Sequence, residues 1–154
     1  MRRMTGFGQT ILRALALALG LALLLGGAPA ETETDKEVKH MQMTIDNTPV
    51  QVEWEENGSV EALKALAAEG LTIQMSMYGG FEQVGSLGKS LPRSDVQTVT
   101  APGDIVLYSG SSIVVFYGSN SWAYTRLGRI VDPANDELEA LLGRGDVTLT
   151  LSMD

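Results

Sequence analysis

The chain has 154 residues, with eleven basic and nineteen acidic side chains and a formal net charge of −8 at pH 7. A surface of this sign repels phosphate backbones, so the composition argues against a nucleic-acid partner. The chain contains no cysteine, which excludes disulfides, thiol catalysis and thiolate metal sites.

The first thirty residues have the order of a secretory signal peptide. Three arginines precede an apolar run that ends at Leu25, and the small-residue sequence GGAPA follows. The run is shorter than the roughly 20 residues that span a bilayer, so we expect a cleaved signal peptide at residues 1–30 and no stable membrane anchor. Cleavage would leave eight basic and nineteen acidic side chains, a net charge of −11. We therefore expect an exported protein, periplasmic or secreted.

After the predicted signal, residues 31–37 are polar and charged, and we expect a flexible leader. From Val38 the residues alternate in polarity, which predicts a strand over 38–46, and a second strand over 50–56 completes a hairpin. The spacing of apolar residues predicts a helix from Val60, with Ser59 as its N-cap. Alternation returns in LTIQMSMY, which predicts one strand over 71–78. Glycines are frequent between residues 79 and 94, and this stretch reads as a long loop.

The second half of the chain continues with short strands. They are predicted over 96–100, 105–108, 113–117 and 122–131, and the run IVVFY is apolar on both faces, as in a strand that is covered on both sides. Asp132 and Pro133 predict the start of a second helix, and a last strand follows over 146–153. Eight strands with two helices predict a small closed or nearly closed β-barrel for residues 38–154, with a two-sheet sandwich as the alternative.

Three stretches carry a resemblance to a known family. YGGFEQVGSLGKSLP (78–92), APGDIVLY (101–108) and IVVFYGSNSWAYTRLGRI (113–130) together resemble the bacterial cyclophilin-like fold family. The resemblance extends over roughly Val38 to Met153. It implies a mainly β domain, a small closed eight-stranded cyclophilin-like β-barrel with two short capping helices, which agrees with the pattern of strands and helices.

The chain departs from the motif of the true cyclophilins, the peptidyl-prolyl isomerases. Those enzymes carry an arginine on a strand before a Phe-x-x-Gln-Gly-Gly loop, and later a pocket with Trp and His. Here Gly79, Gly80 and Phe81 follow Tyr78 without an arginine upstream, and the only histidine is His40 in the first predicted strand. The resemblance therefore does not imply isomerase activity.

Two groups of residues are candidates for a binding site. Trp122, Tyr124 and Arg126 stand at alternate positions of a predicted strand, so they share one face, and these residue types dominate binding hot spots. The alternative is an aromatic strand on which the arginine stacks. The second group surrounds the glycine pair at the start of the loop, where the alternative is a structural corner of the barrel; it comprises Tyr78, Phe81, Glu82 and Gln83. Tyr117, at the end of the predicted strand 113–117, is a further candidate.

Taken together, these patterns predict non-catalytic binding of a peptide or small molecule between the 78–92 loop and the face that carries Trp122. One alternative is a weak prolyl isomerase in which Arg126 is the donor to the imide nitrogen. The other is a structural or interaction domain without a pocket. We expect no cofactor and no metal, and the sequence leaves catalytic residues and the oligomeric state open.

Overall fold

A computed structural model describes residues 37–154 of the chain. The signal peptide predicted at 1–30, and the leader except for its last residue, lie outside the described residues. Within residues 37–154, no helix is long and apolar enough to cross a membrane. Residues Val38–Asp154 form one compact unit.

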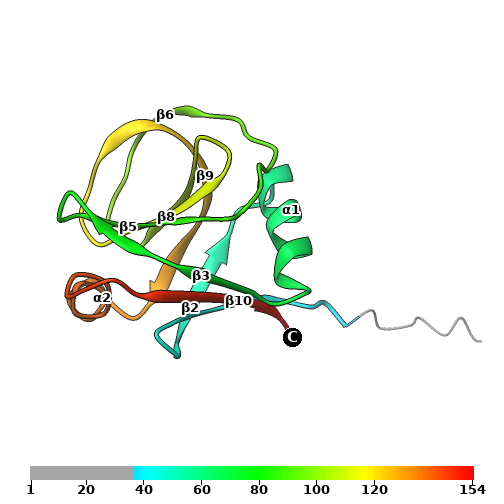
Figure 1. Cartoon of the computed structure of the whole chain (residues 1–154), viewed down its shortest axis with the longest axis horizontal. Helices are drawn as coiled ribbons and strands as arrows, with labels where there is room; N and C mark the ends of the chain where they lie inside the picture. Colours follow the sequence, from blue (N-terminus) through cyan, green and yellow to red (C-terminus); the bar gives the residue numbers. More distant parts are fainter. Residues whose placement is uncertain (1–36) are drawn as a thin grey trace, which may run out of the picture. The chain divides into compact units, whose positions relative to one another are not determined.

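The described part is mainly β, with two helices (Figure 1). Its elements in chain order are β1 (Met41–Ile45), β2 (Thr48–Trp54), α1 (Gly58–Ala67), β3 (Leu71–Gln74), β4 (Ser76–Tyr78), β5 (Glu82–Ser86), β6 (Val96–Val99), β7 (Asp104–Tyr108), β8 (Ser112–Phe116), β9 (Ser121–Asp132), α2 (Asn135–Leu142) and β10 (Thr148–Met153).

The strands form one nearly closed antiparallel sheet. Its order is β3-β10-β1-β2-β9-β7-β8-β5-β4, and β6 pairs with β9 off this path. The two terminal strands of the order, β3 and β4, are halves of one stretch of chain that is interrupted only at Met75. The backbone N–H of Met75 donates to the carbonyl of Val147 at 2.8 Å. The chain itself therefore joins the two ends of the sheet, and the barrel is nearly closed without a ladder between β3 and β4.

Residues 37–154 contain ten strands, where the sequence predicted eight. One extra strand arises because the predicted strand 71–78 is split into β3 and β4. The other is β5, which lies inside the stretch predicted as a glycine-rich loop. A Cβ at Gly85 would collide with the side chains of Met75 and Ile73. Gly85 therefore allows close packing inside a strand, whereas the sequence reading took the glycines of this stretch as turn residues.

The interior of the barrel is one hydrophobic core to which both helices contribute. Val60, Leu63 and Ala67 of α1 and Leu138 and Leu142 of α2 are buried in it. In Figure 1 the two helices lie on opposite sides of the barrel, as the capping arrangement requires. The core also includes buried residues of the strands, among them Met41, Met43, Ile45, Ile73, Met75, Ile105, Leu107, Ile113, Val115, Leu127, Leu149 and Leu151.

The starts of both helices differ from the sequence prediction. Asn57, not Ser59, is the N-cap of α1, because its Oδ1 accepts from the backbone N–H of Val60 at 2.9 Å. The hydroxyl of Ser59 instead donates to the carbonyl of Pro92. Asp132 remains in β9, and α2 begins at Asn135 without a side-chain cap.

A second, smaller hydrophobic cluster lies on the outer face of the sheet. It consists of Val106, Val114, Phe116 and Tyr124, with Phe81 and Val84 packed against it. Because neighbouring residues of a strand point to opposite faces, β7 and β8 are buried on both sides, as the apolar run IVVFY predicted. This outer cluster forms the base of the candidate site.

Candidate functional site

A cavity of about 620 Å³ opens on the outer face of the barrel. Strands β4, β5, β7, β8 and β9 and the turn before β9 all contribute to it. Its lining consists of Ser76, Met77, Tyr78, Glu82, Val84, Tyr108, Val114, Asn120, Trp122 and Tyr124. Strand register explains this grouping, because Val84 is paired with both Ser76 and Val114, and Glu82 with Tyr78. Paired residues of neighbouring strands point to the same face of a sheet.

Four aromatic side chains, here called the aromatic wall, surround the cavity: Tyr78, Tyr108, Trp122 and Tyr124. Tyr78, Tyr108 and Trp122 are exposed, with 66%, 40% and 57% of their surfaces accessible, whereas Tyr124 is buried. The ring of Tyr124 meets that of Tyr108 edge to face, with 6.2 Å between their centroids. Its hydroxyl accepts from Asn120 Nδ2 at 2.9 Å. Tyr124 is therefore held in place, and the exposed rings around it are available to a ligand.

Glu82 is the acidic group of the cavity. Its side chain is buried, and Oε2 has no hydrogen-bond partner among the described residues. Burial raises the pKa of the Glu82 carboxyl from 4.5 to about 7, because the ionised form loses its hydration. Within residues 37–154, no group of three or more His, Cys, Asp or Glu side chains is placed to hold a metal ion. The chemistry of the cavity is thus that of one desolvated carboxyl among aromatic rings.

The structure divides the eight predicted site residues into two sets of four. Tyr78, Glu82, Trp122 and Tyr124 line the cavity. The other four lie outside its lining; they are Phe81, Gln83, Tyr117 and Arg126. Phe81 nevertheless supports the cavity from the side, because its ring meets that of Tyr78 edge to face at 6.3 Å and packs against the outer cluster.

Gln83 and Tyr117 make contacts within the barrel, and those of Gln83 lie near the end of α2. The Nε2 group of Gln83 donates to the carbonyls of Leu142 and Gly145, each at 2.7 Å. Tyr117 packs against the interior core, and its buried hydroxyl has no partner in the described part of the chain. Burial raises the pKa of Tyr117, and the nearby carboxyls of Glu82 and Glu139 raise it further. Gln83 thus connects β5 to the segment that follows α2.

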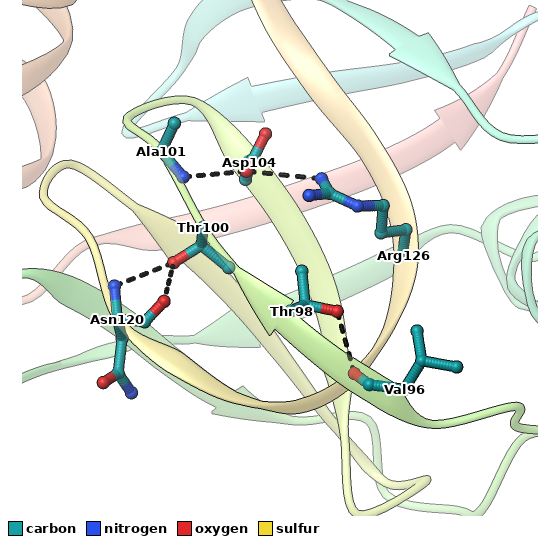
Figure 2. A network of polar contacts seen from close by, with 7 residues as sticks. All are labelled: Val96, Thr98, Thr100, Ala101, Asp104, Asn120 and Arg126. Carbon is teal, nitrogen blue, oxygen red and sulfur yellow. Dashed lines mark hydrogen bonds and ion pairs between the residues drawn. The ribbon is translucent and has the colours of Figure 1, made fainter.

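Arg126 is engaged with a buried acid (Figure 2). Its Nη1 lies 3.3 Å from Oδ2 of Asp104, and the same oxygen accepts from the backbone N–H of Ala101 at 2.8 Å. Arg126 shares a strand face with Trp122 and Tyr124, as alternation predicted. The ion pair explains why its guanidinium is not part of the cavity lining.

A polar network fixes the turn that carries Asn120, as Figure 2 shows. The hydroxyl of Thr100 donates to the carbonyl of Asn120 at 3.0 Å and accepts from its backbone N–H at 2.9 Å. A second backbone bond joins Thr100 N–H to the same carbonyl at 2.8 Å. The side chain of Thr98 bonds within β6, to the carbonyl of Val96 at 2.8 Å. One wall of the cavity is therefore tied to β6.

Six lining residues were not predicted from the sequence: Ser76, Met77, Val84, Tyr108, Val114 and Asn120. In the predicted strand 71–78, Met77 falls on the same side as Met75, but Met75 is buried and Met77 is 36% exposed. All three residues of β4 are exposed, and the strand stands at the end of the sheet order, paired only with β5. For Tyr108 a signal existed, since an aromatic residue ends an otherwise buried strand just before a turn.

The fold and the cavity define a class of protein: a small, mainly β, nearly closed barrel with two helices and an outward-facing aromatic cavity. The chain belongs to the Cyclophilin-like family, whose model matches residues 43–152. This match confirms the resemblance seen in the sequence. A comparison with curated proteins finds no match.

Proposed function

We propose that this protein is an exported cyclophilin-like domain that binds a peptide or small molecule in the outer cavity without chemically changing it. The observation that carries this proposal is the position of the exposed apolar side chains. Of the eight large hydrophobic side chains that are exposed in the described range, four line this one cavity: Met77, Tyr78, Tyr108 and Trp122. Exposed apolar surface concentrated in a concave site is typical of ligand binding.

The volume of the cavity, and the hydrogen bonds that hold part of its lining in place, support binding. A volume of about 620 Å³ lies within the range of small-molecule sites, which is about 300–1,000 Å³. Tyr124 and Asn120 are held by hydrogen bonds, so part of the cavity is formed before a ligand arrives. A preformed site loses less conformational entropy on binding.

A screen of short peptides and small molecules against the full chain tests this proposal, with binding followed by NMR shifts. We expect hits to perturb residues of the cavity and to lose affinity when Trp122→Ala or Tyr108→Ala is introduced. Val131→Ala is the matched control, because Val131 is exposed on β9 but does not line the cavity. Hits that bind equally well to all three variants would contradict the proposal.

The export part of the proposal is supported by the order of basic, apolar and small residues in 1–30. Expression of the full chain in a bacterial host tests it. We expect the exported product to begin at Glu31 when its intact mass is measured. A product that retains Met1 and stays in the cytoplasm would show that this segment does not direct export.

A further inference from the structure

The buried carboxyl of Glu82 goes beyond what a generic binding cavity requires. Apolar ligands need no charge at the base of a cavity, and burial of an unpaired carboxylate destabilises a fold. Glu82 is only 7% exposed, yet it lines the cavity, and its Oε2 is buried without a donor among the described residues. A ligand with a hydrogen-bond donor and a positive charge would supply the missing donor to Oε2 and neutralise the charge of the carboxylate.

The groups around Glu82 do not compensate its charge. Three tyrosines of neighbouring elements line the same cavity: Tyr78 on β4, Tyr108 on β7 and Tyr124 on β9. Tyr117, after β8, lies near the carboxyls of Glu82 and Glu139, so these groups add no cation. No lysine, arginine or histidine belongs to the cavity lining in the described part of the chain. Arg126, the cation on the same strand face as Tyr124, is held by Asp104.

The aromatic wall complements a cation in the same place. Rings within about 6 Å of a positive charge attract it through their quadrupoles, and the attraction grows when the site excludes water. The negative net charge of the chain also favours the approach of cations over anions. A carboxyl and four aromatic rings around one cavity are therefore better matched to a cation than to a neutral or anionic group.

We propose that the cavity binds a primary ammonium group, with the Glu82 carboxylate as its counter-ion and the aromatic wall around its alkyl chain. A primary ammonium has three N–H donors, so it can bond to Oε2, whereas a quaternary ammonium cannot. The ammonium is that of a lysine side chain, a peptide N-terminus or a free alkylamine. This inference rests on the proposed function, and it names the chemical class of the ligand.

The test uses matched probes that differ only in the terminal ammonium group. Nα-acetyl-lysine methylamide carries the ammonium, and Nα-acetyl-norleucine methylamide is its neutral counterpart. Calorimetry or NMR titration at pH 8 should show the lysine probe binding at least about tenfold more tightly, as a charged hydrogen bond predicts. Ala-Ala methylamide and butylamine then show whether a peptide N-terminus or a free amine is accepted in place of the side chain; either result supports the ammonium class.

The pH dependence of the affinity for the lysine probe supplies a second test. Only the ionised carboxylate attracts the ammonium, and burial places the pKa of Glu82 at about 7. The affinity for the lysine probe should therefore be constant well above pH 7 and fall below pH 7 until it approaches that of the norleucine probe, because the ammonium must displace a proton. The norleucine probe should show no such fall.

The variant Glu82→Gln preserves the size of the side chain and removes its charge. We expect it to lose most of the preference for lysine over norleucine and to lose the pH dependence, while circular dichroism confirms that it is folded. Equal binding of the two probes, an affinity that is flat between pH 5 and 8, or an unchanged preference in Glu82→Gln would overturn the inference. If the norleucine probe still binds and Trp122→Ala abolishes that binding, the proposed function stands although the ammonium inference falls. Absence of binding by every ammonium probe at millimolar concentration also overturns the inference, and the broader screen then decides the proposed function.

Discussion

Replacement of Glu82 by glutamine should change how the stability of the protein depends on pH. Burial raises the pKa of Glu82 from 4.5 to about 7, so the folded protein holds this proton more tightly than the unfolded chain does. Below pH 4.5 the carboxyl is protonated in both states, and its burial carries no ionic penalty. Between pH 4.5 and 7 it ionises in the unfolded chain first, so wild-type stability falls as pH rises. Above pH 7 it is ionised in both states, and the full penalty applies.

The size of this penalty follows from the two pKa values. One pKa unit corresponds to about 1.4 kcal/mol, so a rise from 4.5 to about 7 corresponds to about 3 kcal/mol. Glu82 lines a cavity that is open to solvent, so screening reduces this figure. Glu82→Gln has no carboxyl at this position and is free of the penalty. We expect its free energy of unfolding, relative to wild type, to increase by about 1–3 kcal/mol between pH 4.5 and pH 8.

Urea denaturation of the full chain, followed by tryptophan fluorescence at several pH values, measures this difference. Groups that titrate in both proteins cancel when the two are compared at each pH. Glu56→Gln is the matched control, because it makes the same chemical change at an exposed side chain. A difference between Glu82→Gln and wild type that is flat across the range, or that decreases with pH, would refute the assignment of Glu82 as a desolvated acid.

Three further predictions concern the barrel and its chemistry. Gly128→Ala should lower the free energy of unfolding by about 2–4 kcal/mol in urea titrations, because a Cβ would lie 2.6 Å from the carbonyl oxygen of Glu53; a loss below about 0.5 kcal/mol would contradict this packing. Gln83→Ala should cost about 1–3 kcal/mol in the same assay, since two backbone carbonyls at the end of α2 lose their donor, and unchanged stability would show that this bond is dispensable. In a protease-coupled assay on several Xaa-Pro peptides we expect no acceleration of isomerisation at micromolar protein, because Arg126 is paired with Asp104; acceleration that Arg126→Ala abolishes would revive the isomerase hypothesis.

Much of the fold could be predicted from local patterns. Alternation located most of the strands, and the double-sided apolar run IVVFY correctly predicted a strand covered on both faces. Gly85 is a position that local patterns could not assign to a strand. A glycine inside a strand has the same local signature as a glycine in a turn, and only the position of Met75 across the barrel shows that it allows close packing.

Prediction of the candidate site was less complete, for a related reason. Trp122 and Tyr124 stand two positions apart on one strand, so alternation alone placed them on one face. Tyr108 and Val114 reach the same cavity from other strands, through a register that no local pattern contains. Arg126 had the correct strand face, but its partner Asp104 lies 22 positions earlier in the chain, and the pairing of β7 with β9 brings the two together.

The sequence by itself determined that the domain is a cyclophilin-like barrel with two helices, because the periods of its apolar residues and three family stretches are properties of the linear chain. The tertiary structure decided the chemistry of the cavity. In the linear sequence, Glu82 is an ordinary acidic residue in a glycine-rich stretch. Its position opposite Phe116 and Tyr78, beneath the aromatic wall, removes it from water and leaves Oε2 without a donor among the described residues. Desolvation depends on everything that surrounds a group in space, and long-range strand pairing brought those surroundings together.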